Sequence, residues 1–248
     1  MSNRTRHKSR GKMNKLSNSV LTLGRGLWSK NAVPGVRVRG ENLRKMEGSE
    51  WRNWSPRHSK LAAGILRTKL EPSDLLPYQG SQALYLGAGH GTTVSHLHDH
   101  LCGKQNEFGG SIVAVDISSR CMRDLVGLAK KRPGLLPVLA DARKPEGLRP
   151  WLNGRVDWLF QDVSQAGQVG LFIDAAKHYL AAGGVALLSL KSASERIVEG
   201  GANEHYQSAA KAMEESGLEV LEIIHLKGWE EQHALISSTA PKEWPSNS

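Results

Sequence analysis

The feature that most constrains the fold is a regular alternation of short apolar runs and helical periods after residue 80. Apolar runs of four to nine residues, the lengths of buried strands, recur between segments whose apolar residues repeat at helical spacing. The expected strands cover 83–86, 111–115, 135–139, 156–160, 184–190, 218–226 and 233–238. The expected helices cover 92–100, 120–131, 169–179 and 203–216. This order predicts βαβ units and an α/β fold around a mostly parallel sheet, with an antiparallel hairpin at its end.

Upstream of this alternation the chain changes character. Residues 1–20 are polar and basic, a composition typical of a disordered arm. From Val33 to Trp54, short alternating pieces such as Val36–Arg39 stand between glycines, which predicts a small β-rich segment. Lys60–Lys69 has a helical pattern. The expected parts are therefore a basic arm over 1–20, a β-rich segment over 21–57 and the main domain over 58–248.

The excess of positive charge is confined to the N-terminal end. The chain has a net charge of +9, and residues 1–50, with twelve Lys and Arg against three Glu, account for all of it. Such a segment attracts polyanions by releasing their counterions. A solubilising tail without a partner is the alternative interpretation. A lipid surface fits less well, because the segment has no apolar face.

Several classes of site and location are disfavoured by the sequence. Cys102 and Cys121 lack the spacing of a metal site, and no apolar run is long enough for a membrane helix or a secretory signal. His96 and His100 stand four positions apart, but no carboxylate pattern supports zinc. We therefore expect no metal, no membrane segment and a reducing cytoplasm as the compartment.

A glycine-rich loop joins the strand at 83–86 to the helix that follows. The loop reads Gly87-Ala88-Gly89-His90-Gly91-Thr92-Thr93. Glycines let the backbone approach a ligand closely, and ligands of open α/β sheets bind at the carboxyl ends of the strands. A dinucleotide-binding loop would have its third glycine at position 92, where threonine stands. The loop therefore disfavours a nicotinamide coenzyme.

Acidic residues follow three successive strands. Asp116 ends the second strand, Asp141 follows the third and Asp162 follows the fourth. A carboxylate at Asp116 can accept both ribose hydroxyls of an adenosyl group, and one at Asp141 can face an adenine amino group. Each aspartate alone is better explained as a helix cap or a turn residue. Together with the loop, the three predict an S-adenosylmethionine-dependent methyltransferase.

Longer stretches of the chain resemble the fibrillarin family, in particular its archaeal form. The most specific are WRNWSPRHSKLAAGIL at 51–66 and YLGAGHGTTVSHL at 85–97. The others are AVPGVRVRGENL (32–43), AVDISSRCMRDLVGLAKKR (114–132), PVLADAR (137–143), VDWLFQDVSQ (156–165), LLSLKSA (187–193) and QHALI (232–236). The resemblance covers residues 30 to 240.

This resemblance implies a fold and a function. The implied fold is a Rossmann-like class I methyltransferase, with a seven-stranded sheet whose C-terminal strand is antiparallel, plus a small N-terminal β domain. The implied activity is methyl transfer from S-adenosylmethionine to ribose 2′-hydroxyls of rRNA and, in archaea, tRNA, as the catalytic subunit of a box C/D particle. The implied partners are a guide RNA with its target, a Nop-family scaffold protein, and a kink-turn-binding protein related to a ribosomal protein. Base pairing by the guide would then select the target.

The resemblance also assigns residues. The family's catalytic set corresponds to Lys60, Asp162, Lys191 and His233. Its cofactor contacts correspond to Gly87, Ala88, Gly89, Gly91, Thr92, Thr93, Asp116, Ile117, Asp141, Ala142, Asp162 and Gln165. A desolvated lysine near another cation loses its proton more readily, so Lys60 and Lys191 are both candidates for the base, and the sequence does not decide between them. Asp162 would fix an ammonium group, and His233 would orient Lys191 or relay the proton.

Four positions depart from the family pattern. Gly89-His90 stands where small residues are usual, Asp116 replaces a more frequent glutamate, and Ile117 replaces a usual phenylalanine. The last change weakens stacking on adenine. None of these departures falls on the four catalytic positions.

Other functions remain open at this stage. One is a stand-alone methyltransferase acting on RNA, protein or a small molecule without a guide. Another is a non-catalytic particle subunit that keeps the fold, although intact Asp162 and Lys191 argue against it. A nicotinamide-dependent dehydrogenase is the most distant alternative.

Overall fold

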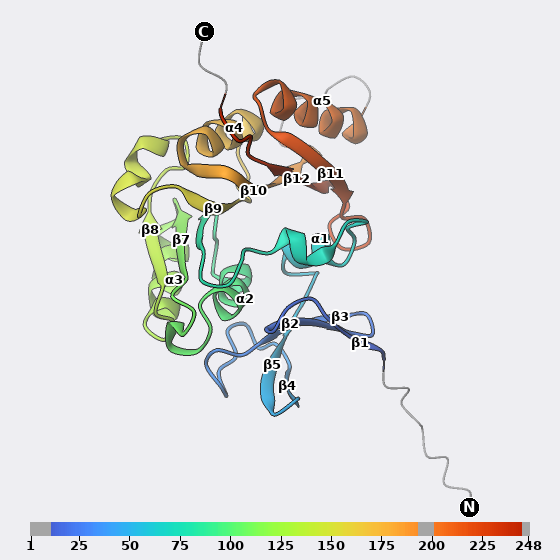
Figure 1. Ribbon diagram of the computed structural model, residues 1–248, viewed down its shortest axis with the longest axis vertical. Coiled ribbons are helices and arrows are strands. Elements are labelled where there is room, and N and C mark those ends of the chain that lie inside the picture. Colours follow the sequence, from blue (N-terminus) through green and yellow to red (C-terminus); the bar gives the residue numbers. More distant parts are fainter. Residues whose placement is uncertain (1–10, 193–200, 245–248) are drawn as a thin grey trace, which may run out of the picture.

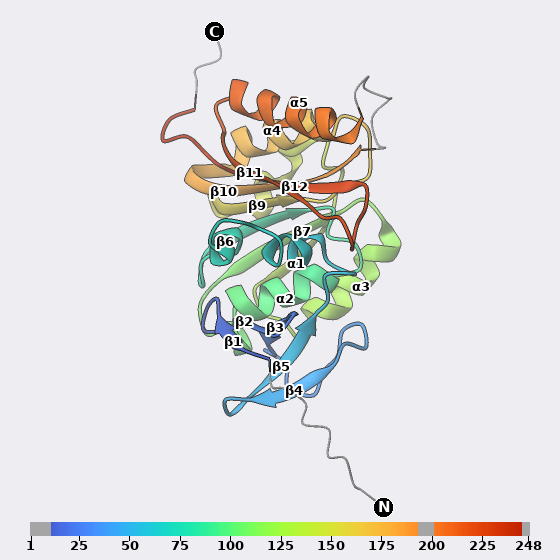
Figure 2. The ribbon, with the colours of Figure 1, turned by 90° about the vertical axis from the view of Figure 1, so that its right-hand side faces the viewer.

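The computed structural model of the protein describes residues 11–192 and 201–244. Its elements lie in four layers, seen most clearly from the side in Figure 2. A small sheet near the N-terminus packs under helices α1, α2 and α3, which cover one face of a larger sheet (Figure 1). Helices α4 and α5 cover the opposite face of the larger sheet.

The small sheet has five antiparallel strands in the order β1-β2-β3-β5-β4. Their bounds are β1 Met13–Lys15, β2 Val20–Leu23, β3 Gly26–Lys30, β4 Leu43–Met46 and β5 Ser49–Trp54. Strand β1 lies in the segment expected to be a disordered arm, so that expectation was wrong for these residues. They are ordered because pairing with β2 supplies their backbone hydrogen-bond partners. The arm's first ten residues lie outside the described part of the chain.

The expectation of a strand at Val36–Arg39 was wrong. These residues form a loop between β3 and β4. The carboxylate of Glu41 accepts hydrogen bonds from the backbone N–H groups of Val38, at 2.9 Å, and Arg39, at 2.7 Å. Side-chain acceptors of this kind replace the ladder partners that a strand would need.

The larger sheet has seven strands in the order β11-β12-β10-β9-β6-β7-β8. Only β12 runs antiparallel to its neighbours. The bounds are β6 Gln82–Leu86, β7 Ser111–Asp116, β8 Leu135–Leu139, β9 Val156–Gln161, β10 Leu180–Lys191, β11 Glu219–His225 and β12 His233–Thr239. The predicted α/β fold, with its mostly parallel sheet and antiparallel C-terminal strand, is confirmed.

The helices largely follow the predicted periods. Their bounds are α1 Lys60–Ile65, α2 Thr92–Leu101, α3 Ser119–Ala129, α4 Gln168–Tyr179 and α5 Ala202–Glu215, with short 3-10 helices at Pro72–Leu75, Lys104–Asn106 and Pro145–Trp151. Helix α1 ends before the expected Lys69, because the carboxylate of Glu222 binds the Thr68 hydroxyl at 2.5 Å and the Lys69 N–H at 3.1 Å. No helix of the described residues is long and apolar enough to cross a membrane.

The strands read as unbroken apolar runs because both faces of the larger sheet are covered. On β6, Ala83 and Tyr85 pack into the core below helices α1–α3, whereas Leu84 and Leu86 pack into the core under α4 and α5. The alternation of side chains along a strand divides each run between the two cores.

Buried histidines connect the small sheet to α2. The ring of Trp54 stacks on His96 with centroids 5.0 Å apart, and Nδ1 of His96 lies 2.7 Å from the Ser29 hydroxyl. Nδ1 of His100 lies 2.7 Å from the hydroxyl of Ser19. Burial lowers the pKa of both histidines, so both are neutral hydrogen-bonding groups at pH 7. These histidines, which the sequence left as unlikely metal ligands, therefore fix the small sheet on the larger domain.

Candidate active site

A cavity of about 410 Å³ opens at the carboxyl ends of four adjacent strands. It is lined by residues that follow β6, β7, β8 and β9, the four parallel strands at the centre and one edge of the sheet. Eight of the twelve predicted cofactor contacts line it: Gly87, Gly89, Asp116, Ile117, Asp141, Ala142, Asp162 and Gln165. The position agrees with the general placement of ligands in open α/β sheets.

The glycine loop forms one wall of this cavity. Gly87 has a φ of 81°, and a Cβ placed there would collide with the backbone carbonyl of Asp162. The N–H of Asp162 donates to the carbonyl oxygen of Leu86 at 2.9 Å. Glycine is therefore required at position 87 for both its conformation and its contact with the next strand end. At Gly89, which also lines the cavity, a Cβ would meet no atom within 4 Å, so the backbone there is open to a ligand.

Asp116 lies opposite the loop and is held in a fixed orientation. One carboxylate oxygen accepts the N–H of Gly89 at 2.8 Å, and the other accepts the N–H of Ser118 at 2.8 Å. A carboxylate has about four acceptor positions, so each oxygen keeps capacity for a hydroxyl donor. Ile117 beside it is 64% exposed and offers an apolar surface at the rim. The pair could therefore hold a ligand that combines hydroxyl donors with a flat apolar ring.

Asp141, on the far side of the cavity, is held by its neighbour Arg143. The two side chains form a close ion pair, with Nη2 of Arg143 2.6 Å from Oδ2 of Asp141. The Arg143 hydrogen bonds lower the pKa of Asp141 to about 2. The carboxylate is thus ionised at neutral pH and can accept a hydrogen bond from an amino group.

The remaining four predicted cofactor residues do not line the cavity. They are Ala88, Gly91, Thr92 and Thr93. Thr93 is buried, and its hydroxyl is hydrogen-bonded to that of Ser59 at 2.9 Å. The first turn of α2 directs this side chain toward α1 rather than toward the cavity.

Lys60 contacts the carboxylate of Asp162 at the end of the cavity that Gly87 lines. Nζ of Lys60 is 2.8 Å from Oδ1 and 3.0 Å from Oδ2 of Asp162. Each side chain is about one-fifth exposed, at 20% and 18%, so the pair is reachable from solvent. Lys60 is the first residue of α1, and Asp162 follows β9 directly.

A buried hydroxyl places the start of α1. Ser59 caps the helix by accepting the N–H of Ala62 at 3.2 Å, and it also accepts the indole N–H of Trp54 at 3.0 Å. Near the end of α1, a Cβ at Gly64 would overlap the side chain of Leu235, so α1 lies directly against β12. Ser59 was not among the predicted site residues, although a serine before a helical run is a recognisable cap.

Lys191 and His233 face each other across the antiparallel pair β10–β12. Lys191 is the last residue of β10, His233 is the first of β12, and the two are partners in the register. Burial lowers the pKa of His233, and the nearby charges of Lys60 and Lys191 lower it further against the opposing effect of Glu230 and Asp162. The structure therefore brings all four predicted catalytic positions to one end of the sheet.

A second residue that sequence reasoning missed supports this end. Gln168 is buried, with its amide oxygen 3.3 Å from the N–H of Lys191 and its amide nitrogen bonded to the carbonyl of Val163. It connects the end of β10 to the segment after Asp162. No local pattern in the sequence marks this role.

Comparisons with known proteins agree with this geometry. The sequence model of the family described as Fibrillarin matches residues 14–242. A "Fibrillarin-like rRNA/tRNA 2'-O-methyltransferase" from Thermococcus sibiricus is 39% identical over 213 residues, which cover 86% of this chain and 89% of the relative. The chain belongs to the fibrillarin family.

Two solved fibrillarin structures are also similar to this chain. The Aeropyrum pernix fibrillarin, solved with natively bound S-adenosyl-L-methionine, has 32% sequence identity and a TM-score of 0.75, covering 92% of this chain and 99% of that one. The fibrillarin of a fibrillarin/Nop5p complex has 30% identity and a TM-score of 0.70, covering 86% and 93%. In both cases the matched part of this chain is longer than the larger domain, so the likeness also includes the small sheet.

One departure from the fibrillarin pattern, the Gly89-His90 pair, has a structural explanation. Nδ1 of His90 lies 2.8 Å from Oδ2 of Asp124 on α3, and the carbonyl oxygen of His90 accepts a hydrogen bond from Arg39 at 2.8 Å. His90 thus links the glycine loop to α3 and to the loop between β3 and β4. Gly89, with a φ of 56°, provides the left-handed backbone conformation immediately before His90.

Proposed function

We propose that this fibrillarin-family protein transfers a methyl group from S-adenosylmethionine to ribose 2′-hydroxyls of rRNA and tRNA, directed by a box C/D guide RNA. The observation that carries the proposal is the convergence of Lys60, Asp162, Lys191 and His233 beside a cavity suited to an adenosyl ligand. The names of the relatives and the bound ligand of the Aeropyrum structure support the same reaction.

The cofactor-binding residues in this proposal come from both walls of the cavity. Gly87 and Gly89 would lie along the methionine portion, Asp116 would accept the ribose hydroxyls, and Asp141 would face the adenine amino group. Bound S-adenosylmethionine supplies an electrophilic methyl group on a sulfonium, so that a C–O bond forms as the S–C bond breaks.

The chain's own residues then have to orient the 2′-hydroxyl and remove its proton. A hydroxyl is a poor nucleophile at neutral pH, and the attack must be in line, so position matters as much as basicity. The Lys60–Asp162 pair fixes the side of the cavity where the methyl group would lie. Lys60 and Lys191 are the candidates for the base that removes this proton. Burial, together with the charges of Lys60 and Lys191, lowers the pKa of His233, so a neutral His233 would orient Lys191 or relay the proton.

The proposed assembly follows from the family. A Nop-family scaffold is supported by the fibrillarin/Nop5p complex, and a kink-turn-binding protein and the guide RNA complete the proposed particle. In this proposal the guide RNA selects the target nucleotide by base pairing. The proposed compartment is the cytoplasm of an archaeal-type cell.

The test is reconstitution with a box C/D guide RNA, a target RNA, the Nop-family protein and the kink-turn-binding protein. We expect 2′-O-methylation at the guided nucleotide, and loss of it in Lys191→Ala. Lys177→Ala, a lysine on α4, is the matched control and should retain activity. Full activity of Lys191→Ala would contradict the assigned mechanism. Methylation without guide or scaffold would indicate a stand-alone enzyme, and absence of cofactor binding in calorimetry would indicate a non-catalytic subunit.

A further inference from the structure

A second cavity also borders the glycine loop. It has a volume of about 410 Å³ and is formed by residues 36–39 of the β3–β4 loop, by His90, and by α3 with the residues that follow it. Gly89 lines the first cavity and His90 lines the second, so the two are separated by one turn of the glycine loop.

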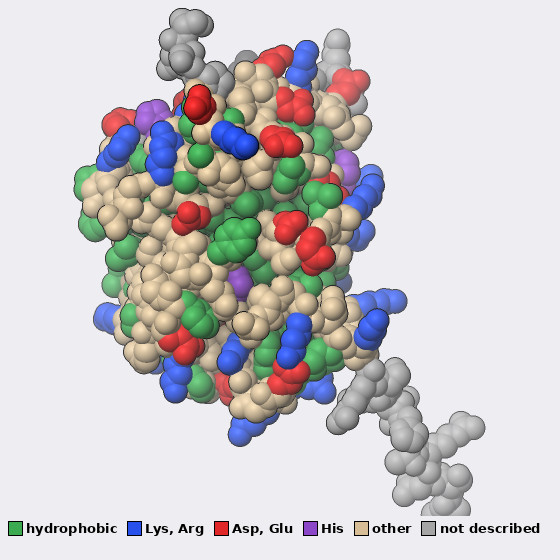
Figure 3. Space-filling model, in the orientation of Figure 1, with side chains coloured by type: hydrophobic (Ala, Val, Ile, Leu, Met, Phe, Trp, Pro, Cys, Tyr) green, Lys and Arg blue, Asp and Glu red, His purple; other side chains and the backbone are tan. Residues whose placement is uncertain are grey.

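The lining of this second cavity is strongly basic. Five of its eleven residues are Arg or Lys and only one, Asp124, is acidic, so it favours an anion. The basic residues are Arg37, Arg39, Arg123, Lys131 and Arg132. In Figure 3, Lys and Arg side chains also stand out over the lower part of the molecule, where the small sheet lies.

The single acid of the lining is already engaged. Asp124 contacts His90 at 2.8 Å, Arg39 at 3.3 Å and Arg123 at 3.5 Å. By contrast, Arg37 and Lys131 are exposed and form no ion pair within residues 11–192 and 201–244. Two cations of the cavity are thus available to a ligand.

A buried arginine forms part of the cavity and lacks hydrogen-bond partners. Arg132 is 1% exposed, and its Nε and Nη2 atoms have no hydrogen-bond partner in the described part of the chain. Its nearest acid is Asp99, with Nη2 3.5 Å from Oδ1. Burying these two nitrogens without acceptors is costly, because their three N–H donors lose water without replacement.

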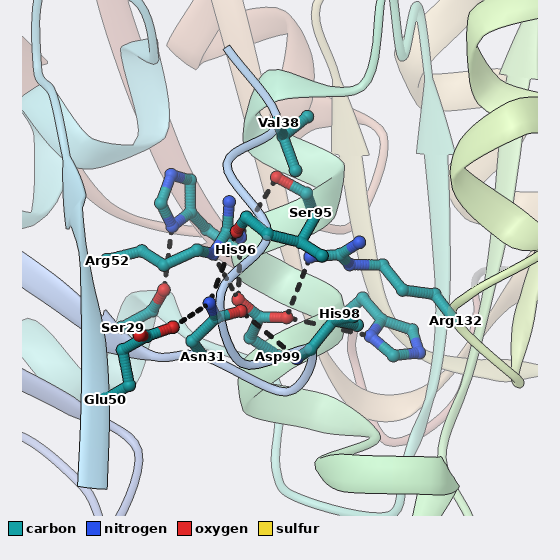
Figure 4. Close-up of polar contacts among 12 residues, drawn as sticks. Ser29, Asn31, Val38, Glu50, Arg52, Ser95, His96, His98, Asp99 and Arg132 are labelled. Atoms are coloured by element: carbon teal, nitrogen blue, oxygen red, sulfur yellow. Dashed lines mark hydrogen bonds and ion pairs between the residues drawn. The ribbon is translucent and has the colours of Figure 1, made fainter. Parts of the chain in front are cut away.

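Asp99 holds Arg52 more closely than Arg132, because its Oδ2 is hydrogen-bonded to Arg52 whereas its Oδ1 lies 3.5 Å from Nη2 of Arg132 without a hydrogen bond. Nη2 of Arg52 lies 2.6 Å and Nε 2.7 Å from Oδ2 of Asp99. Figure 4 shows Arg52 and Arg132 reaching Asp99 from opposite sides. The other carboxylate beneath the cavity, Glu41, binds Arg52 and the backbone of the β3–β4 loop. Even with these two acids included, the cations of this region outnumber the carboxylates by six to three, so the charge is still positive.

We propose that this cavity is a phosphate-binding site that holds a phosphodiester group of an RNA strand, with Arg132 as its floor and Arg37 and Lys131 at its rim. Planar guanidinium groups match phosphate oxygens in pairs, which supplies the acceptors that Arg132 lacks. The choice of RNA as the source of the phosphate rests on the proposed function. A strand bound here would pass beside the glycine loop and help to hold the target near the cofactor cavity.

The test measures binding of the full chain to a short single-stranded oligoribonucleotide by fluorescence anisotropy over a series of salt concentrations. Arg37→Ala/Lys131→Ala removes the two exposed cations of the cavity. Loss of the contact to the one phosphate held here should reduce the slope of log Kd against log salt by about 0.7 and weaken binding about fivefold near 0.1 M salt. The matched control, Lys104→Ala/Lys211→Ala, removes the same charge from exposed positions elsewhere and should change the slope little.

Several outcomes would overturn the site. Equal losses in the two double variants would mean diffuse charge attraction only, and absence of RNA binding by the unaltered chain would exclude an RNA site altogether. Inorganic phosphate is the second probe. If phosphate binding depends on Arg37 and Lys131 whereas RNA binding does not, the site takes free phosphate instead.

A variant of the buried residue completes the design. Arg132→Gln should weaken RNA binding further if its thermal unfolding remains cooperative, and an unaffected Kd in such a folded variant would contradict the role of Arg132. If the variant does not fold, the rim variant alone decides. Because binding is measured without methylation, a failure of the guide-directed reaction would leave this result unchanged, so the two proposals fail separately.

Discussion

Lys60 and Asp162, 102 positions apart in the chain, form an ion pair in which Nζ lies 2.8 Å and 3.0 Å from the two carboxylate oxygens. The pair joins the first residue of α1 to the end of β9. It therefore connects the element that follows the small sheet with the centre of the larger sheet, at the edge of the cofactor cavity.

Asp162→Asn tests the role of this pair. The amide keeps the size of the side chain but cannot neutralise Lys60, so we expect methylation to fall at least about a hundredfold, a magnitude typical of groups that act in proton transfer and orientation. Because the pair is partly solvated, stability should change by only about 1 kcal/mol. Methylation rate and denaturant midpoint are measured on the same preparation. Asp174→Asn on α4 is the control, and equal rates for both variants would remove Asp162 from the mechanism.

Gly87→Ala tests the contact between the glycine loop and the strand end that carries Asp162. The added Cβ would collide with the Asp162 carbonyl and would also be strained at a φ of 81°. We expect a loss of about 1–3 kcal/mol in unfolding free energy and weaker binding of S-adenosylmethionine in calorimetry. Gly170→Ala, inside α4 with open space around it, should be neutral or stabilising. Unchanged cofactor affinity in Gly87→Ala would show that the close approach is not required.

Much of the larger domain was predictable because its signals are local. Apolar runs and helical periods lie within single elements, and the strand-end acids Asp116, Asp141 and Asp162 follow directly from where those strands stop. The resemblance to fibrillarins then supplied the predicted catalytic positions, which local patterns alone would not have distinguished from surface lysines and a surface histidine.

The contacts that complete the site were not predictable, because they join distant positions. Arg52 and Asp99 are 47 positions apart, and His90 and Asp124 are 34 apart. Thr93 lies in the loop motif, and the start of α2 turns its hydroxyl toward Ser59. Motif membership gave its place in the chain but not the direction of its side chain.

Buried histidines make stability depend on pH. The pKa of His96 is well below the ordinary value of 6.5, because burial and the charges of Arg52 and Arg132 disfavour its protonated form. At a pH between the folded and unfolded pKa values of His96, the unfolded chain binds more protons than the folded protein. Stability is therefore lost as pH falls below about 6.5. The unfolding free energy, measured by urea denaturation from pH 7.5 downward, should therefore decrease in this range.

A histidine variant isolates this effect. His96→Gln removes the titrating ring and should flatten the pH dependence below 6.5, although it also loses the stacking on Trp54. His178→Gln, an exposed histidine on α4, should leave the slope unchanged. A slope that is the same in both variants and in the unaltered chain would mean that His96 does not contribute to acid destabilisation.

Asp99→Asn tests the buried charges between the small sheet and α2. Arg52 would keep Glu41, but both Arg52 and Arg132 would lose the carboxylate that lies between them, and removing one partner of a buried ion pair costs about 3–5 kcal/mol. We expect a large drop in the urea midpoint. Asp74→Asn makes the same chemical change at an exposed position and should shift the midpoint little. Added phosphate or RNA should restore part of the loss if an anion enters beside Arg132, whereas a variant as stable as the unaltered chain would show that Asp99 is not needed to neutralise the two arginines.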